Sequence, residues 1–380
     1  MKLWFLTLMS IGCFSVLMAQ NAAFPSGTFP PSTNISAAQY PRLDEQGRGY
    51  FQLRAPQAKQ VQLDLGKMYD MVQSPEGVWS VTTEALEPGF HYYSLVIDGV
   101  RVADPASESF FGTGRMSSAI DVPEKGVDFY TIKEVPHGGI LIKSYYSSTT
   151  NSWRKMHLYL PPGYDANAQM RYPVVYIQHG GGEDERGWSQ QGKTDVILDN
   201  LIASGRAKPM IVVMTNGNVS SGRGGYSIEA MSSFADELTK NIVPFVDKQF
   251  RTIANRSSRA LCGLSMGGGQ AFYVGLTHLD VFASIGIFSS GIFGGINSAA
   301  AFDGEKEMPG LLTKSASFNE KLDLFYISCG TGDPRFSHTQ KAVETFKNKG
   351  LKVQFSGFPG GHEWQVWRKS VHDFAQMLFK

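Results

Sequence analysis

Ser265 lies in the sequence Gly263-Leu264-Ser265-Met266-Gly267, which has the G-x-S-x-G spacing of a nucleophilic serine at a strand-to-helix turn. Glycines on either side let the chain reverse sharply without side-chain clashes, so that the serine hydroxyl projects at the tip of the turn. The pentapeptide alone is weakly specific, because the chain contains 41 glycines. The apolar run before it and the helix-like segment after it favour a nucleophile over a serine in a glycine-rich turn.

A serine hydroxyl is a weak nucleophile unless a base accepts its proton, and histidine is a common base. Among the eight histidines, His362 follows the last predicted strand in a glycine-containing loop and precedes a predicted helix. His338 is the main alternative, because it also lies shortly after a predicted strand. A structural role suits the histidines that fall within other predicted elements: His91, His157, His278 and His372.

The imidazole in turn needs a carboxylate that holds its tautomer and stabilises its positive form. Asp333 lies four residues after Cys329, just past the end of another apolar run. Asp303 and Glu305 fall in an apparent insertion, and Asp323 lies at the beginning of its predicted strand rather than past its end. We therefore predict that Asp333 is the carboxylate partner of the base.

Acyl transfer also needs hydrogen-bond donors aimed at the oxyanion that develops on the substrate. The backbone N–H of Gly180 or Gly181, just after an earlier predicted strand, would supply one donor, and the N–H of Met266 the second. His179 beside these glycines is a potential metal ligand, but its neighbours lack a metal-binding spacing such as H-E-x-x-H. We therefore expect no metal at this site.

The predicted elements place these residues at one edge of a sheet. In residues 153–380, strands rich in Val and Ile alternate with helix-like segments, which is typical of a mainly parallel sheet covered on both faces. Sites in such sheets form beyond the carboxyl ends of the strands. Because Ser265, Asp333 and His362 follow the chain order of an α/β-hydrolase triad, we predict that fold. The predicted strands span 172–178, 208–215, 259–265, 283–290, 322–330 and 351–358, and helices 194–205, 234–250, 339–350 and 366–380.

Residues 25–122 have a different sequence pattern. Short runs with partial alternation are separated by turn signals, with no helical period between them, which favours an antiparallel β-sandwich. Residues 123–152 form a predicted connection, although 125–132 and 139–147 within it are possible strands. We expect an α/β protein in which a small sandwich precedes the hydrolase domain.

The whole chain of 380 residues has an ordinary globular composition, with 42% hydrophobic and 18% charged residues and a formal net charge of +1. Clustered Lys and Arg, which drive binding to nucleic acid or anionic membranes, are missing from the sequence. Residues 1–19 read as a secretory signal peptide, with lipidation at Cys13 a weaker alternative. We therefore expect an exported protein, secreted or periplasmic, with no membrane attachment after cleavage.

Cys262 and Cys329 both lie in apolar runs that read as buried strands. We expect two buried thiols rather than a disulfide, because another strand should lie between them.

Two stretches of the chain resemble known families. Residues 53–65, 77–82 and 86–107 resemble the immunoglobulin-like carbohydrate-binding module of family 48, which implies contact with glycan or with the neighbouring domain. From about residue 137 onward, the chain is similar to carbohydrate esterase family 1, the esterase D-like group that includes feruloyl and acetylxylan esterases. The matching stretches are 159–165, 172–188, 197–214, 259–289, 327–333 and 360–374.

The resemblance places Ser265, Asp333 and His362 on the family's triad positions. It implies a serine esterase that removes acyl groups, feruloyl first and acetyl second, from plant cell-wall polysaccharide or oligosaccharide esters, without a cofactor. Three aromatic residues in loops are candidates for stacking on sugar or on a feruloyl ring: Trp188, Tyr226 and Trp364. The alternatives are a siderophore esterase of the enterochelin type, which also joins a sandwich to this hydrolase type, and a non-catalytic glycan-binding protein.

Overall fold

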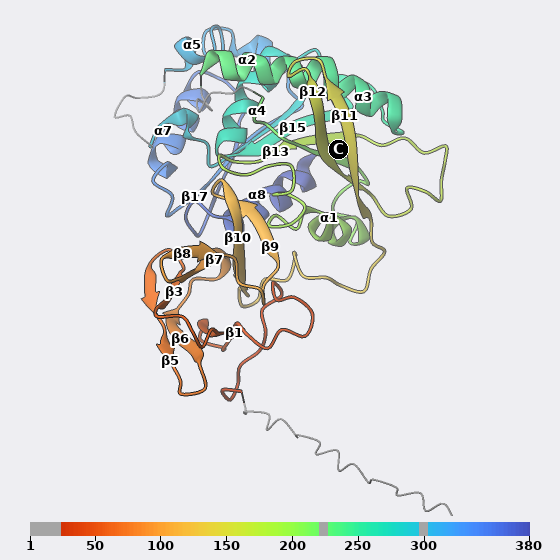
Figure 1. The fold of residues 1–380 in the computed structure, drawn as a ribbon. Helices are drawn as coiled ribbons and strands as arrows, with labels where there is room; N and C mark the ends of the chain where they lie inside the picture. The colour runs from red at the N-terminus through yellow and green to blue at the C-terminus, as the bar shows by residue number, and fades with distance from the viewer. Residues whose placement is uncertain (1–23, 220–226, 296–302) are drawn as a thin grey trace, which may run out of the picture.

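The computed structural model describes residues 24–219, 227–295 and 303–380. The predicted signal peptide lies outside these residues. Within the described part of the chain, no helix combines the length and the hydropathy needed to cross a membrane. Figure 1 shows a β-rich N-terminal part next to a larger part in which helices surround a sheet.

The N-terminal part consists of two antiparallel sheets that pack face to face. Their strand orders are β1-β2-β6-β5 and β4-β3-β7-β10-β9, with β8 paired to β7. Side chains from both sheets meet in one apolar core, including Phe51 and Trp79 from the first sheet and Leu63, Tyr93 and Ile120 from the second. The strands are β1 (Arg42–Leu43), β2 (Arg48–Arg54), β3 (Val61–Asp64), β4 (Met68–Asp70), β5 (Val72–Gln73), β6 (Val78–Ala85), β7 (Gly89–Ile97), β8 (Val100–Val102), β9 (Ser109–Gly112) and β10 (Arg115–Val122).

The C-terminal part is built on an eight-stranded sheet with the order β11-β12-β14-β13-β15-β16-β17-β18. Strands β11 and β12 are antiparallel to their neighbours, and the other six run parallel. The strands are β11 (Gly139–Ser147), β12 (Ser152–Leu160), β13 (Val174–Gln178), β14 (Ile211–Thr215), β15 (Arg259–Leu264), β16 (Ser284–Phe288), β17 (Leu324–Gly330) and β18 (Gln354–Phe358).

One of the two possible strands in the predicted connection is present. Strand β11 lies within 123–152 and pairs along its whole length with β12, so this half of the segment belongs to the large sheet. Residues 125–132, the other possible strand, form turns instead.

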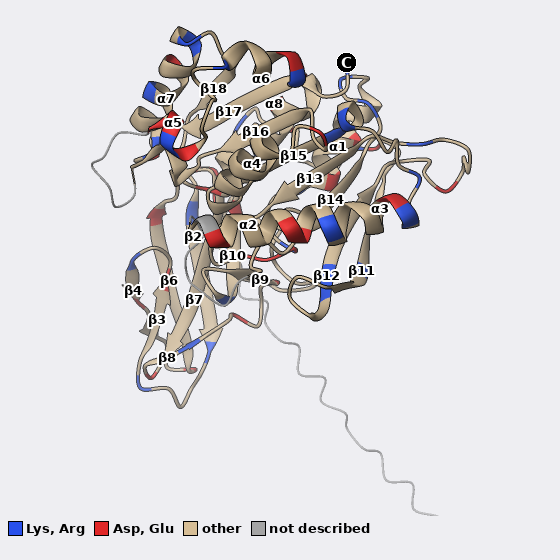
Figure 2. Cartoon of the chain, turned by 90° about the horizontal axis from the view of Figure 1, so that it is seen from above, with Lys and Arg blue, Asp and Glu red and all other residues tan. Residues whose placement is uncertain are grey.

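Helices cover both faces of the large sheet, because successive strand residues point to opposite faces and both sets are apolar. Val175 and Ile177 pack with residues of α1 and α8, whereas Val174 and Tyr176 pack with residues of α2 and α4. Figure 2 shows that charged residues gather on the helices and loops around the sheet. The helices are α1 (Thr194–Ala203), α2 (Ile228–Asp236), the π-helix η1 (Glu237–Ile242), α3 (Val243–Gln249), the 3₁₀ turns η2 (Arg256–Ser258) and η3 (Gly291–Phe293), α4 (Met266–Thr277), α5 (Gly304–Glu307), α6 (Ser315–Lys321), α7 (Phe336–Asn348) and α8 (Trp364–Met377).

The two cysteines of the C-terminal part lie on different strands. Cys262 is on β15 and Cys329 is on β17, and β16 separates them in the sheet, as the sequence predicted. Both are buried and free.

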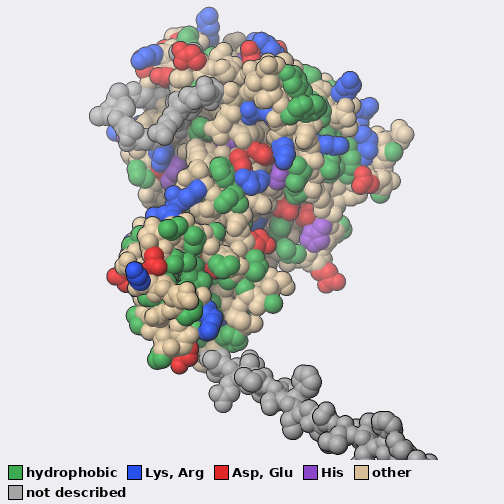
Figure 3. Space-filling model, viewed as in Figure 1, with side chains coloured by type: hydrophobic (Ala, Val, Ile, Leu, Met, Phe, Trp, Pro, Cys, Tyr) green, Lys and Arg blue, Asp and Glu red, His purple; other side chains and the backbone are tan. Residues whose placement is uncertain are grey.

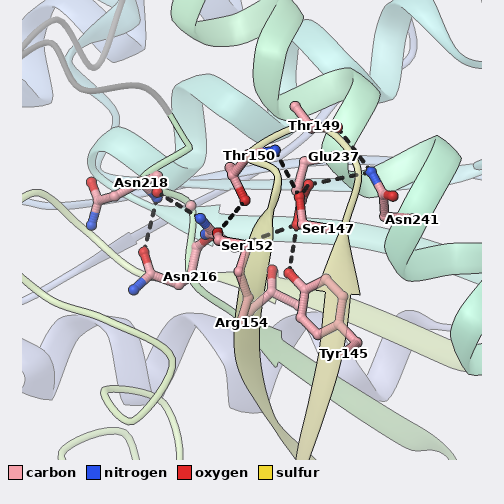
Figure 4. Close-up of polar contacts among 12 residues, drawn as sticks. Tyr145, Ser147, Thr149, Thr150, Ser152, Arg154, Asn216, Asn218, Glu237 and Asn241 are labelled. Carbon is pink, nitrogen blue, oxygen red and sulfur yellow. Dashed lines mark hydrogen bonds and ion pairs between the residues drawn. The ribbon is translucent and has the colours of Figure 1, made fainter.

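A buried polar cluster connects β11 and β12, the antiparallel strands at the edge of the large sheet, with the π-helix η1 (Figure 4). The carboxylate of Glu237 accepts hydrogen bonds from Tyr145 and Ser147 of β11 and forms an ion pair with Arg154 of β12. Glu237 is fully buried. Arg154 also donates to the backbone oxygen of Asn216 at 2.6 Å, which ties this edge to the loop after β14.

The sandwich is joined to the hydrolase part by buried ionic contacts. Asp121 at the end of β10 accepts hydrogen bonds from Arg368 of α8 at 3.0 and 3.2 Å and from Lys193 at 2.6 Å. Arg368 is fully buried. In Figure 1 the strands β9 and β10 extend from the sandwich toward the hydrolase part. On the face shown in Figure 3, cationic and anionic side chains are interspersed, with no large patch of one sign.

Candidate active site

Ser265 lies at a strained turn between β15 and α4. Its backbone has φ 51° and ψ −114°, which a residue with a side chain rarely adopts. A Cβ on Gly263 would come within 2.5 Å of the backbone of Gly267, and a Cβ on Gly267 would come within 2.5 Å of the backbone oxygen of His179. Both glycines of the pentapeptide are therefore required by close backbone packing, and the turn presents the serine side chain beyond the sheet.

Three residues from three different strand ends form a hydrogen-bonded relay. The hydroxyl of Ser265 lies 3.0 Å from Nε2 of His362, which follows β18. Nδ1 of the same imidazole lies 2.6 Å from Oδ2 of Asp333, which follows β17. These are the residues that the sequence suggested for nucleophile, base and carboxylate.

The carboxylate of Asp333 is stabilised in its charged form. Burial by itself raises the pKa of Asp333, but hydrogen bonds from His362 and from the backbone and guanidinium of Arg335 outweigh burial and hold the pKa below its ordinary value. An ionised Asp333 accepts the Nδ1 proton of His362, which leaves Nε2 free to accept the proton of Ser265.

The alternatives from the sequence lie elsewhere. His338 is on α7, where its ring packs against Gly294. Asp303 caps the N-terminus of α5 by accepting from the backbone of Glu305 and Lys306. Neither side chain contacts the relay.

Of the proposed oxyanion donors, the N–H of Gly180 already has a hydrogen-bond acceptor within the protein. Its N–H donates to Oε2 of Glu183 at 3.1 Å. The N–H of Gly181 has no acceptor among the described residues. Met266 is the first residue of α4, so its N–H has no acceptor within the helix. The available pair of donors is thus Gly181 and Met266.

His179 is held inside the protein beside these donors. Nδ1 of its ring lies 2.7 Å from the oxygen of Gly180, and Nε2 accepts the N–H of Gly217 at 3.0 Å. Burial lowers the pKa of His179, so the ring stays neutral and links the loop after β13 to the loop after β14. The described residues contain no group of three or more potential metal ligands.

A cavity of about 250 Å³ opens onto the relay. Its wall combines residues of both parts of the chain, because the sandwich contributes side chains from β7 and from the turn between β9 and β10. Sequence reasoning did not identify the sandwich residues, Glu183 or Trp367 as part of the site. The lining residues are Phe90, Tyr92, Thr113, Gly180, Gly181, Glu183, Leu264, Ser265, His362, Glu363, Trp364 and Trp367.

The three aromatic candidates have different positions. The prediction that Trp188 contacts substrate is wrong. Its side chain is 1% exposed, donates from Nε1 to the backbone oxygen of Gln178 and packs in the core, so substrate cannot reach it. Trp364 lines the cavity although it is only 2% exposed. Tyr226 lies outside the described residues. Trp367 also lines the cavity, and its ring meets that of His362 edge to face at 5.0 Å.

The nucleophile turn, the relay and the mainly parallel sheet define the α/β-hydrolase class of fold. A family model described as "Putative esterase" matches residues 147–378. The chain therefore belongs to this esterase family, as the sequence motifs predicted.

Two of the curated relatives are xylanases by name. The chain is 36% identical over 369 residues to an endo-1,4-beta-xylanase/feruloyl esterase of Xylanibacter ruminicola. The matched region covers 94% of this chain and 48% of that protein. It is 33% identical over 199 residues to endo-1,4-beta-xylanase Y of Acetivibrio thermocellus, covering 50% of this chain and 17% of that protein. The chain thus spans less than half the length of these relatives.

Solved structures share the fold. A ferulic acid esterase from Anaeromyces mucronatus, solved with ferulic acid, has a TM-score of 0.56 and 28% identity over 67% of this chain and 96% of its own. The enterobactin esterase of Shigella flexneri covers 88% of this chain and 94% of its own with a TM-score of 0.64, but its identity of 16% indicates a common fold alone.

Proposed function

We propose that this protein is a serine carboxylic-ester hydrolase that removes feruloyl groups, and secondarily acetyl groups, from plant cell-wall polysaccharide such as arabinoxylan. The observation that carries the proposal is the relay of Ser265, His362 and Asp333 at the mouth of the cavity, with two N–H donors beside the nucleophile. A scaffold that only binds glycan has no need for this arrangement.

The chemistry follows from the geometry. Nε2 of His362 accepts the proton of Ser265 as its hydroxyl attacks the ester carbonyl, and the N–H groups of Gly181 and Met266 stabilise the oxyanion. The tetrahedral intermediate collapses, and the alcohol leaves with the proton from His362. Water then attacks the acyl-enzyme by the same steps and releases the acid.

The size of the cavity supports an acyl group as its occupant. Its volume of about 250 Å³ is near the lower end of the usual range for ligand pockets, roughly 300–1,000 Å³. Its rings from Phe90, Tyr92, Trp364 and Trp367 suit an aromatic acid, whose π-face they can contact.

A second cavity supports a sugar chain as the leaving group. This sandwich cavity of about 370 Å³ shares Phe90, Tyr92, Thr113 and Glu363 with the catalytic cavity. An ester whose acyl group occupied the catalytic cavity would therefore have its alcohol side next to the sandwich. We propose that the sandwich, which resembles the family 48 module, contacts the glycan here.

Export is part of the proposal. The N-terminal apolar segment and the names of the xylan-degrading relatives support a secreted or periplasmic protein that meets polysaccharide outside the cytoplasm. Nucleic acid and membrane are not proposed as partners.

The substrate class is tested by release of acid from a panel of esters. Methyl ferulate and feruloylated arabinoxylan report ferulate release, acetylxylan reports acetate release, and enterobactin reports siderophore hydrolysis. We expect ferulate release to have the highest kcat/KM. Acetate release alone would reassign the acyl group, and hydrolysis of enterobactin alone would reassign the protein to the siderophore esterases, whose fold it shares.

A further inference from the structure

Glu183 is a carboxyl group in the catalytic cavity that the mechanism above does not use. It is 6% exposed and lies in the loop that carries Gly181, one of the two proposed oxyanion donors. Its Oε2 accepts the N–H of Gly180 at 3.1 Å, and its own N–H donates to the oxygen of Gly180 at 3.3 Å. These two hydrogen bonds close residues 180–183 into a compact turn with Gly181 at its tip.

Tyr92 on β7 of the sandwich contacts the other carboxyl oxygen. Its hydroxyl oxygen lies 3.4 Å from Oε1 of Glu183 and accepts N–H groups from Gln191 at 2.8 Å and from Trp364 at 3.2 Å. Both of those groups can only donate, so the hydroxyl proton of Tyr92 remains for Glu183. Burial raises the pKa of Tyr92 well above its ordinary value, so the hydroxyl keeps this proton.

The sandwich also contacts the backbone of the same loop. The N–H of Gly114, in the turn between β9 and β10, donates to the oxygen of Gly182 at 2.8 Å. A Cβ on Gly182 would lie 3.1 Å from the backbone of Thr113 and of Gly114, and φ there is +80°. The turn of the β9–β10 hairpin therefore rests directly on the loop that carries Gly181.

We propose that Glu183 is a positioning residue of the oxyanion site: by binding the N–H of Gly180 it directs the N–H of Gly181 toward the oxyanion, and Tyr92 of the sandwich holds it there. The proposal rests on the proposed ester hydrolysis. The carboxyl group of Glu183 lies close to Ser265. A Cβ placed on Gly180 would lie 3.4 Å from Oε2 of Glu183 and 3.5 Å from Cβ of Ser265. Those two atoms are thus less than about 7 Å apart.

The buried position of this carboxyl affects its pKa. Burial is the largest cause and raises the pKa of Glu183 to about 7, while hydrogen bonds from Gly180, Trp364 and Tyr92 oppose it and the charge of Asp184 adds to it. The other ionisable groups that face the cavity are Tyr92, His362 and Glu363, and Arg186 is bound to Asp184. An ionised Glu183 repels an oxyanion in the same cavity, so kcat should decrease as pH rises through this pKa.

The test compares Glu183→Ala and Glu183→Gln with wild type, on methyl ferulate and with a fluorophosphonate probe that labels activated serines. The alanine variant should lose about 10- to 100-fold in kcat with KM within about twofold, because the loop loses its closing bond. The glutamine variant should retain most of kcat, because its amide oxygen still accepts the N–H of Gly180, and its NH2 group loses only the long contact of 3.4 Å with the hydroxyl of Tyr92. It should also lack the decrease in kcat near pH 7.

Glu185→Gln is the matched control, because this carboxylate lies in the same loop but binds Asn216 and does not line the cavity. It should behave as wild type in kcat and pH profile. Ser265→Ala should not be labelled by the probe.

Two results would overturn the positioning role: a Glu183→Ala variant changed only in KM, or a Glu183→Gln variant with the wild-type decrease near pH 7. If the alanine variant fails to fold, the glutamine variant alone tests the positioning role. If wild type hydrolyses no ester but is labelled at Ser265, the proposed function fails. The relative labelling rates of the two variants then still test the positioning role, and a wild type that is not labelled refutes both.

Discussion

Asp333 determines which nitrogen of His362 faces Ser265, the proposed nucleophile. It accepts the Nδ1 proton at 2.6 Å and is itself held by two hydrogen bonds from Arg335. An amide in its place would present N–H as readily as oxygen to Nδ1 and would favour the wrong tautomer of the imidazole. In the proposed mechanism the carboxylate contributes through orientation and charge, without direct contact to the ester.

Replacing Asp333 with Asn should lower kcat by about 10⁴-fold with little change in KM. Steady-state kinetics on methyl ferulate would measure this. Asp323→Asn is a suitable control, because this exposed aspartate precedes β17 and lies away from the cavity. A loss of less than about tenfold would contradict the assigned role of Asp333.

The same substitution should change the pH dependence of stability. Because the folded-state pKa of Asp333 is lowered, its contribution to the free energy of unfolding is present above its ordinary pKa of about 4 and is lost as pH falls through the folded value. Asp333→Asn should therefore be less stable than wild type at pH 6 and approach it toward pH 3. Urea unfolding at both pH values would show whether the difference narrows.

At the level of elements, the turn from β15 to α4 depends on backbone packing. Gly267 has the backbone of His179 where a Cβ would lie, at 2.5 Å, so the helix can approach β13 only if the residue is glycine. Backbone atoms cannot move aside as a flexible side chain can. The strained φ of Ser265 is maintained by this packing.

Gly267→Ala should destabilise the protein by about 1–3 kcal/mol and displace the nucleophile, which would lower kcat. Gly139→Ala on β11 is the control, because nothing lies within 4 Å of a Cβ at that position. Urea denaturation and kinetics on the two variants would compare them. Equal stability and activity would show that the turn tolerates a side chain.

The six parallel strands of the large sheet were predictable, because each apolar run is followed by a polar or glycine-rich loop at the same edge. Ser265, Asp333 and His362 each stand at such a position, and local pattern was sufficient to select them. Tyr92 and Thr113 were not predictable, because they reach the cavity through packing of two separate sheets. Trp188 was misassigned because a loop tryptophan can fold back into the core, which only its contacts reveal.

At the level of the whole molecule, a buried ionic contact fixes the sandwich against the hydrolase part. Asp121 on β10 pairs with Arg368 and Lys193, and all three side chains are largely buried. Burial raises the pKa of Asp121, but the two cations outweigh it and keep the group charged. Because the cavity has walls from both parts, this contact also preserves the shape of the site.

Asp121→Asn should lower the free energy of unfolding by about 3–5 kcal/mol, because it leaves the buried Arg368 and the partly buried Lys193 without their anion. Asp128→Asn removes an exposed ion pair with Lys133 and should change stability by less than about 1 kcal/mol. Urea unfolding of both variants would test the contrast. Similar values would show that the buried contact adds nothing beyond packing.

The sandwich cavity gives a prediction about polymer substrates. Arg115 lines this cavity but not the catalytic one. Arg115→Ala should raise KM for feruloylated arabinoxylan by about 2- to 10-fold, the value of one lost hydrogen bond, and leave KM for methyl ferulate unchanged. An equal change in KM for both substrates would show that Arg115 does not contact the glycan.

The central claim is that Ser265 is the nucleophile of an ester hydrolase, and ferulate release from methyl ferulate by wild type and Ser265→Ala tests it most directly. We predict measurable turnover by wild type and a loss of about 10⁵- to 10⁶-fold in kcat for the variant, with the fold intact by circular dichroism. Comparable ferulate release by both proteins would contradict the account, because the ester would then be hydrolysed without the serine.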